Sequence, residues 1–153
     1  MLHKIFPSVP ATCWRCSVAV GTYLHVWWEC ERIRPFWTQV FECYNKIYDK
    51  SLVPSPKIAL LSILPGSVQS QRRSLLRFFM SSAQQLIPSY WKSTATPPLS
   101  RWVSIMNDTM RMEEMLALDN DTFANYTLLW LVWLHFSSSD TLTNMLSTQP
   151  CHS

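Results

Sequence analysis

The stretch CWRCSVAVGTYLHVWWEC, residues 13–30, decides how this chain begins, because it holds Cys13 and Cys16 followed by His25 and Cys30. Zinc takes four tetrahedral ligands, commonly Cys thiolates and His nitrogens, and two cysteines spaced in this way can present both sulfurs from one tight turn. The residues between Cys16 and His25 let the chain travel out and back. These four side chains are therefore predicted to bind one Zn²⁺. Its role would be structural, since the closed tetrahedron leaves no position for water.

The middle of this stretch is predicted to form a short hairpin. Gly21 and Thr22 are the expected turn, because glycine favours tight reversals. The expected strand residues are β-branched or aromatic: Val18, Val20, Tyr23 and Val26.

The alternative to a metal site is a buried set of thiols. Cys43 is expected to be an inert core residue in either case, because it lies on the apolar face of a predicted helix. Cys151 and His152 belong to the C-terminal tail and are left out of the ligand set.

Aromatic and basic residues surround the cluster, and this mixture can stack bases and hold phosphates. Trp14 lies between the paired cysteines and is expected to project outward, and Arg15 is the leading candidate for a phosphate contact. Arg32 and Arg34 follow the last ligand. The alternative is that the aromatic residues form the miniature core of the metal module.

Charge is distributed unevenly along the chain. Residues 51–101 carry six Lys or Arg and no Asp or Glu, whereas residues 102–153 carry one against six. The basic segment suggests an anionic partner such as RNA or DNA, with Arg72, Arg73 and Arg77 as candidate contacts. Packing of this segment against the acidic third of the chain is the alternative.

The rest of the composition favours helices divided by prolines. The chain has 10 Pro but only 2 Gly, and 48% of its 153 residues are hydrophobic. Apolar residues recur at three- and four-residue spacing. The spacing predicts four to five helices, near residues 34–49, 57–64, 69–90, from 100 onward, and from 121 or 122 to 135. Trp102, Val103, Met106, Met110, Met115 and Leu116 are the expected inward positions of the fourth. The predicted class is mainly α, a small CCHC zinc-bound hairpin module followed by a helical bundle.

Three regions follow from these patterns: a zinc-knuckle-like module over 1–33, a helical region over 34–136, and a disordered Ser/Thr-rich tail over 137–153. Residues 1–12 are expected to be extended because of Pro7 and Pro10. No secretory signal is predicted there, so the chain is expected inside the cell, in the nucleus or cytoplasm. No membrane partner is expected, because the most apolar run, 126–136, is far shorter than the roughly 20 residues that a spanning helix needs.

Enzymatic motifs are missing from the sequence. It has no G-x-S-x-G elbow, no glycine-rich phosphate loop and no H-E-x-x-H helix. The adjacent acids Glu113 and Glu114 point to different sides of a helix and are expected to be solvated. We therefore expect no catalytic residues.

Several segments resemble one known family: LHKIFP (2–7), CWRC (13–16), GTYLHVWWEC (21–30), IRPFW (33–37), WK (91–92), PPLS (97–100) with Trp102, and MRMEE (110–114). They are similar to the C-terminal region of the reverse transcriptase polyprotein of LINE-type (non-LTR) retrotransposons, especially amphibian copies. The resemblance covers about residues 2–135. In other LINE branches the first cysteine pair is one residue wider.

The resemblance implies that the Cys/His-rich region binds RNA or target DNA, and that the endonuclease and polymerase domains lie upstream in the parent protein. This chain has no aromatic-x-Asp-Asp palm motif, which two-metal nucleotide transfer requires. The leading hypothesis is a non-catalytic, zinc-dependent nucleic-acid-binding fragment of such a protein. The alternative is an orphan helical interaction domain, or a pseudogene product, in which zinc only supports the fold.

Overall fold

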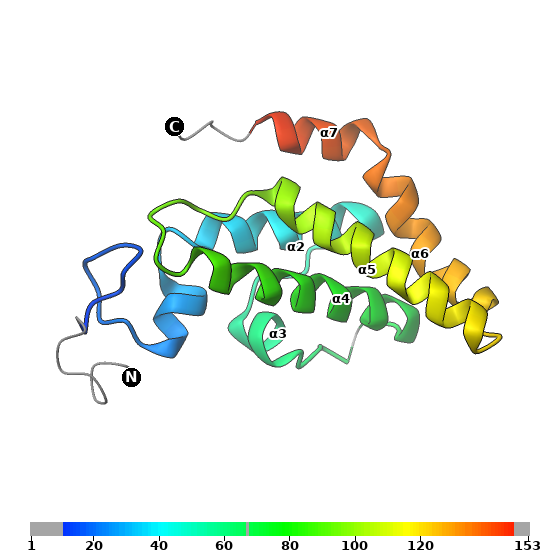
Figure 1. Ribbon diagram of the computed structural model, residues 1–153, viewed down its shortest axis with the longest axis horizontal. Coiled ribbons are helices and arrows are strands. Elements are labelled where there is room, and N and C mark those ends of the chain that lie inside the picture. Colours follow the sequence, from blue (N-terminus) through cyan, green and yellow to red (C-terminus); the bar gives the residue numbers. More distant parts are fainter. Residues whose placement is uncertain (1–10, 67, 149–153) are drawn as a thin grey trace.

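The computed structural model describes residues 11–66 and 68–148, with an N-terminal Cys/His module at one end of a bundle of helices (Figure 1). The elements are η1 (His25–Glu29), α2 (Arg34–Tyr48), α3 (Pro56–Leu61), α4 (Ser70–Leu86), η2 (Ile87–Tyr90), α5 (Leu99–Asp119), α6 (Phe123–Ser137) and α7 (Asp140–Ser147). The predicted mainly α class, with a small Cys/His module at its start, is confirmed.

Prolines and left-handed residues set the limits of the helices. Pro35 and Pro56 lie in the first turns of α2 and α3, where no backbone N–H is needed. Asp49 and Ser62 end these helices with positive φ angles of 48° and 52°. The helix predicted over 57–64 therefore stops at Leu61. The helix predicted over 69–90 ends at Leu86, before Pro88, and the chain continues as the short 3₁₀ segment η2.

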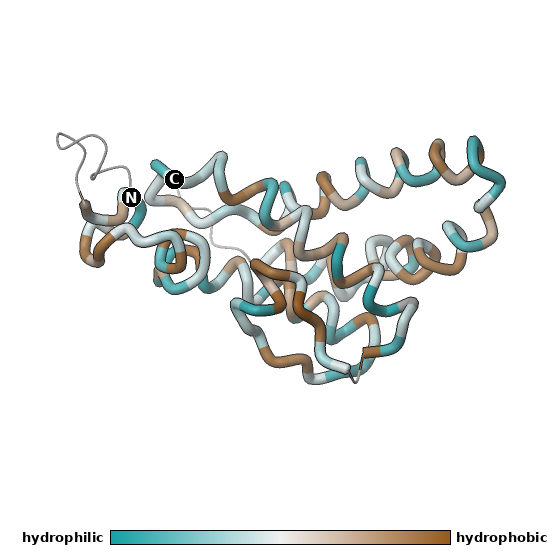
Figure 2. Tube along the Cα trace, turned by 90° about the horizontal axis from the view of Figure 1, so that it is seen from below, coloured by the Kyte–Doolittle hydropathy of each residue, from teal (hydrophilic) through white to brown (hydrophobic). Residues whose placement is uncertain are grey.

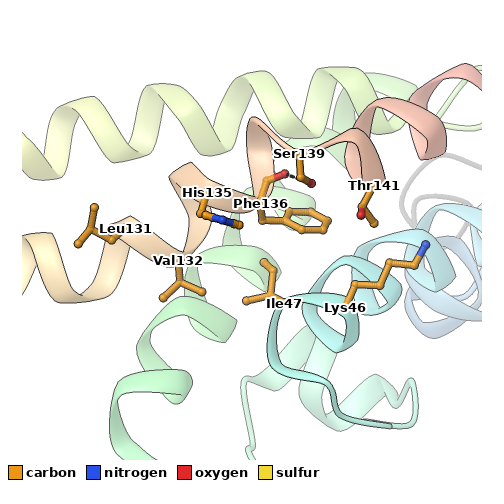
Figure 3. A pocket seen from close by; sticks show the side chains of 8 residues that line it. All are labelled: Lys46, Ile47, Leu131, Val132, His135, Phe136, Ser139 and Thr141. Atoms are coloured by element: carbon orange, nitrogen blue, oxygen red, sulfur yellow. Dashed lines mark hydrogen bonds between the residues drawn. The ribbon is translucent and has the colours of Figure 1, made fainter.

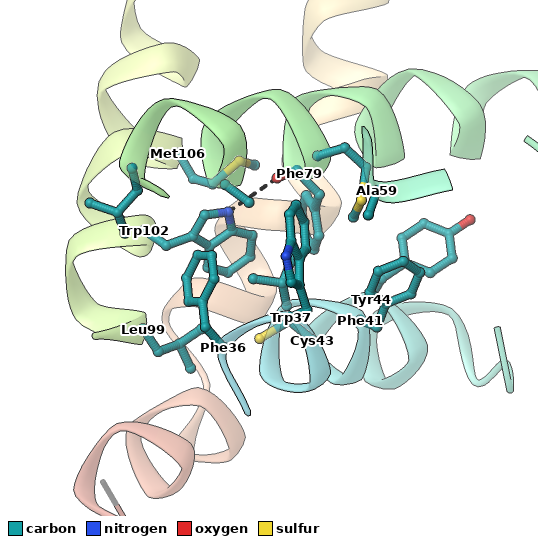
Figure 4. Close-up of a cluster of buried hydrophobic side chains, with 14 of the residues drawn as sticks. Phe36, Trp37, Phe41, Cys43, Tyr44, Ala59, Phe79, Leu99, Trp102 and Met106 are labelled. Atoms are coloured by element: carbon teal, nitrogen blue, oxygen red, sulfur yellow. Dashed lines mark hydrogen bonds between the residues drawn. The ribbon is translucent and has the colours of Figure 1, made fainter. Parts of the chain in front are cut away.

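The core is a layer of aromatic rings between α2, α4, α5 and α6 (Figure 4). Phe79 of α4 is at its centre. Its ring meets those of Trp102 and Trp133 edge to face, at centroid distances of 4.9 and 5.4 Å. The two indole N–H groups are satisfied, since Trp102 donates to the Phe79 carbonyl and Trp133 to Asn107 Oδ1. Aromatic pairs of this kind contribute about 0.5–1.5 kcal/mol each beyond the area they bury.

The metal module shares this core. Cys13 and Cys30 are buried in one cluster with Ile33 and Phe36. The Trp37 indole donates to the carbonyl of Trp27 in η1, at 2.7 Å. The module is thus packed against the bundle through α2.

The prediction of a disordered tail is wrong for residues 140–147, which form α7. Ser139 caps this helix by accepting a hydrogen bond from the Leu142 N–H, and Leu142 and Met145 are buried. Three consecutive serines hid the cap, and one turn and a half of apolar spacing is too short a signal to stand out. The predictions for residues 1–10 and 149–153 lie outside the described residues.

The inward positions predicted for α5 hold only over its first half. Trp102 and Met106 are buried, whereas Met115 and Leu116 are 65% and 54% exposed. The reason is visible in Figure 1, where the end of α5 and the start of α6 extend past α4 at the right-hand side. Within the described ranges, no helix combines the length and the apolar character needed to cross a membrane.

Candidate metal centre and adjoining surface

The first two ligands stand on a tight turn. The Ser17 N–H donates to the Cys13 carbonyl and the Cys13 N–H donates to the Ala19 carbonyl, both at 2.8 Å. Ser17 takes the left-handed conformation, with φ of 59°. A single antiparallel bridge between Thr12 and Val20 closes the loop. The chain therefore reverses between Cys13 and Ser17, which brings the sulfurs of Cys13 and Cys16 to one side.

The predicted hairpin around Gly21 and Thr22 is wrong. The Thr22 hydroxyl accepts from the His25 N–H at 3.1 Å, and the chain turns into helix there, so Tyr23 and Val26 are not strand residues. Gly21 serves a different purpose from the one expected. A Cβ at Gly21 would lie 3.3 Å from backbone atoms of Thr12 and Cys13. Glycine allows this close approach of the two strands of the loop.

The four predicted ligands come together. The Sγ atoms of Cys13 and Cys30 are 4.0 Å apart, Cys16 Sγ is 3.4 Å from His25 Nε2, and all four ligand atoms lie within 4.8 Å of one another. Zn–S and Zn–N bonds of about 2.3 and 2.0 Å give tetrahedral edges of roughly 3.5–3.8 Å. The cluster could hold a metal ion with little rearrangement.

The surroundings of the Cys16 and Cys30 thiols shift their pKa values in opposite directions. Backbone N–H groups of Ala19 and Val18, with a smaller contribution from His25, lower the pKa of Cys16 to about 6. Burial raises the pKa of Cys30, and the nearby Cys13 and Cys16 add to this effect. A thiolate at Cys16 is the ready first ligand, whereas Cys30 needs the charge of a cation to ionise. Cys43 is buried apart from the cluster, and burial raises its pKa to about 12, consistent with an inert core thiol.

Arg15 is not on the surface, and the prediction that it is a leading phosphate contact is wrong. Its side chain is 1% exposed, and Nη1 donates to the Val26 carbonyl at 2.8 Å. Among the described residues, its Nε and Nη2 have no hydrogen-bond partner. Sequence reasoning assigned Arg15 by its type, and the turn that points Trp14 outward directs its neighbour inward.

The buried guanidinium is consistent with a metal in the cluster. A Zn²⁺ ion with three thiolates and a neutral imidazole carries a net charge of −1. Arg15 is adjacent in sequence to the ligand Cys16, so its +1 charge would offset that of a zinc-loaded cluster. Without the ion, a buried cation with unpaired N–H groups would be costly.

Trp14 is exposed as predicted, at 42%, and it has a neighbour that sequence reasoning missed. Lys92, in the segment after η2, places its Nζ 5.6 Å from the centre of the Trp14 ring and 5.2 Å from that of Trp91. Trp91 is 36% exposed. The Trp91-Lys92 pair after Pro88 is visible in the sequence as an adjacent ring and cation. Its large separation in sequence from the Cys/His cluster gave no reason to place it beside Trp14.

Arg32 and Arg34 are exposed beyond the last ligand. The Arg32 carbonyl accepts a hydrogen bond from Thr96 Oγ1 at 2.8 Å, which ties this turn to the segment that follows Lys92. Trp14, Trp91, Lys92, Arg32 and Arg34 are called the head surface below.

The three arginines of α4 are separate from the head surface. Arg72 stacks over the Tyr48 ring at 5.1 Å, and Arg73 donates to the carbonyls of Val68 and Gly66. These contacts give both residues a structural use that the sequence did not reveal. Arg77 is exposed. The structure does not bring the three together with the metal cluster, since α4 begins at the other end of the molecule (Figure 1).

A groove of about 510 Å³ lies between α2 and α6 and contains none of the predicted site residues (Figure 3). Its polar groups have local roles. Lys46 pairs with Glu42 at 2.9 Å, and the Ser139 hydroxyl donates to the Phe136 carbonyl at 2.6 Å while it caps α7.

No model of a known protein family matches this chain.

Proposed function

We propose that this chain is a non-catalytic nucleic-acid-binding module in which a structural Zn²⁺ holds the head surface in place. The proposal agrees with the resemblance to the C-terminal region of LINE reverse transcriptases. Three sulfurs and one nitrogen form a donor set that suits Zn²⁺. The four ligands are all supplied by the protein, which supports a structural role for the ion.

The observation that carries the proposal is the exposed group of rings and cations beside the cluster. Lys92 lies between the Trp14 and Trp91 rings, which are both partly open to solvent. Such rings stack bases of single-stranded nucleic acid without regard to sequence, at about 1–3 kcal/mol per base. Arg32 and Arg34 can hold the phosphates that flank a stacked base.

The buried Arg15 alters the mechanism that the sequence suggested. Arg15 supports the metal site, and the phosphate contacts fall to Lys92, Arg32 and Arg34. RNA and DNA both offer bases and phosphates to such a surface. A single-stranded segment suits it best, because paired bases cannot reach the rings.

The test is binding of a fluorescein-labelled single-stranded RNA to the zinc-loaded full chain, measured by anisotropy across a salt series. Each phosphate contact should add about −0.7 to the slope of log K against log salt. The Trp14→Ala and Lys92→Gln variants should each weaken binding. Arg111→Gln is the matched control, because the Arg111 side chain is 73% exposed and belongs to the distant end of the bundle. Negligible binding by metal-loaded protein would defeat the proposal.

The alternative hypothesis, a helical interaction domain, is favoured by one observation at the other end of the molecule. Large apolar side chains are exposed on α5 and α6, including Met112, Leu118, Leu128 and Leu131. Isolated exposed residues are ordinary, but a group of this kind is typical of a contact surface.

A further inference from the structure

We propose that the tip of the α5–α6 hairpin binds a basic amphipathic helix of a partner protein. The tip is the part of the hairpin farthest from the metal module and is defined by six residues: Met112, Glu113, Leu116, Asn120, Tyr126 and Leu129. This inference is independent of nucleic-acid binding by the head surface.

The tip contains a hollow with apolar walls. A cavity of about 370 Å³ lies between the two helices, lined among others by Leu116, Leu129 and Tyr126. Met112 precedes Leu116 by four residues on the same face of α5, and these two side chains are 62% and 54% exposed. Methionine adapts its shape to an incoming apolar side chain. The hollow can therefore receive the apolar side of a helix, which is the usual way that a groove recognises one.

Within residues 11–66 and 68–148, no segment covers the outer side of α6. Its sequence between Tyr126 and Phe136 is apolar around the whole helix, a pattern typical of a helix buried on all sides. Leu128, Leu131 and Leu134 are nevertheless 61%, 53% and 47% exposed. Figure 2 shows apolar and polar segments alternating along the helices that extend to the right, away from the N-terminus.

Charge decides which partner fits. From Met112 to Phe136 the chain has four acidic residues and no Lys or Arg. Glu113 lines the hollow, and Glu114 lies close enough to contribute to the raised pKa of Tyr126, behind the larger effect of burial. Because both tips would be acidic, a symmetric pairing of two copies would bring like charges together. A helix with Lys or Arg beside its apolar face meets both the hollow and its acidic rim.

The probe is a labelled helical peptide of roughly 18 residues, with Leu at three- and four-residue spacing and Lys elsewhere. A matched peptide carries Glu in place of every Lys. We expect the Lys peptide to bind the zinc-loaded full chain at least about tenfold more tightly than the Glu peptide. Attraction to the whole chain cannot explain this order, because the net charge of the chain is +3.

Two double variants separate the contributions of charge and apolar contact. Each double variant should lower the affinity for the Lys peptide about tenfold and leave RNA binding by the head surface unchanged. The first is Glu113→Gln with Glu114→Gln, and the second is Met112→Gln with Leu116→Gln. Val53→Gln is the control, since Val53 is 75% exposed in the loop between α2 and α3 and is not among the residues that line the hollow. Equal affinity for the two peptides, or variants that bind as well as wild type, would overturn the proposal. The proposal would also be overturned if sedimentation showed that the wild-type chain is a dimer and that the Met112→Gln, Leu116→Gln variant is a monomer.

Discussion

Replacing the buried arginine of the metal module by methionine, Arg15→Met, tests how the head of this protein is built. Methionine can fill the space of the arginine stem but has neither its charge nor its N–H groups. Because Arg15 is buried and donates to the Val26 carbonyl, the change is expected to weaken metal binding first. If Arg15 contacts phosphate, as its sequence position suggests, the change weakens only nucleic-acid binding.

The magnitude follows from the contacts of Arg15. The Val26 carbonyl loses its donor at 2.8 Å within a site where Arg15 is 1% exposed. An unsatisfied buried acceptor costs about 1–3 kcal/mol. The net charge of −1 on a Zn²⁺ site with three thiolates also loses its neighbouring cation, an effect of the same sign. Since metal binding and folding of the head are linked, zinc affinity should fall roughly 5- to 150-fold.

The assay is competition for zinc against a chromophoric chelator, with RNA anisotropy measured in parallel on the metal-saturated protein. Arg32→Met is the matched control, because the Arg32 side chain is 55% exposed. It should keep the zinc affinity of wild type and bind RNA more weakly. Wild-type zinc affinity in Arg15→Met, together with a loss of RNA binding as large as that of Arg32→Met, would refute the structural role of Arg15.

Three further outcomes are expected. Cys16→Ser should reduce the zinc content of the purified protein from one ion per chain to none and unfold the head, because the loss of one ligand removes the folding energy that the ion supplies. Cys43→Ala is the control and should keep its zinc. An unchanged zinc content in Cys16→Ser would exclude Cys16 as a ligand. Burial raises the pKa of Cys43 from 9.0 to about 12, so its contribution to stability is complete below pH 9 and falls by about 1.4 kcal/mol per pH unit from pH 9 toward pH 12. In urea titrations over this range, the free energy of unfolding of Cys43→Ala should therefore fall less steeply with pH than that of wild type. Leu142→Ala should lower the free energy of unfolding by about 2–5 kcal/mol and so lower the urea midpoint, because Leu142 is buried. Asn144→Ala is the control, since Asn144 is exposed and its loss should leave the midpoint unchanged. Identical midpoints for the two variants would mean that α7 does not pack on the bundle.

Much of the fold was predictable because its signals are local. Pro35, Pro56 and Pro88 mark helix limits through their own backbone geometry, and the spacing of Phe36 and Val40 identifies the buried face of α2. The metal ligands were predictable for the same reason, since the two residues between Cys13 and Cys16 are a spacing typical of paired zinc ligands. The nucleic-acid role that the resemblance implies stays a prediction.

What sequence reasoning missed depends on contacts between distant segments. The Trp91-Lys92 pair is recognisable in the sequence but does not indicate that Lys92 lies over Trp14, and nothing near Arg15 indicates that the Val26 carbonyl accepts its hydrogen bond inside the fold. Gly21 illustrates a subtler failure. Glycine serves both turns and close backbone approach, and a single sequence cannot distinguish the two uses.

The shared burial of Cys13 and Cys30 with Phe36 has a consequence for how the protein responds to its surroundings. Because Cys13 and Cys30 form one core with the bundle, a metal ion bound by the four candidate ligands would be coupled to the cooperative unfolding of both head and bundle. Each tenfold rise of free zinc above its dissociation constant should add about 1.4 kcal/mol to the stability of that unit. The amount of intact protein would then follow the supply of zinc, with metal-starved chains open to proteolysis.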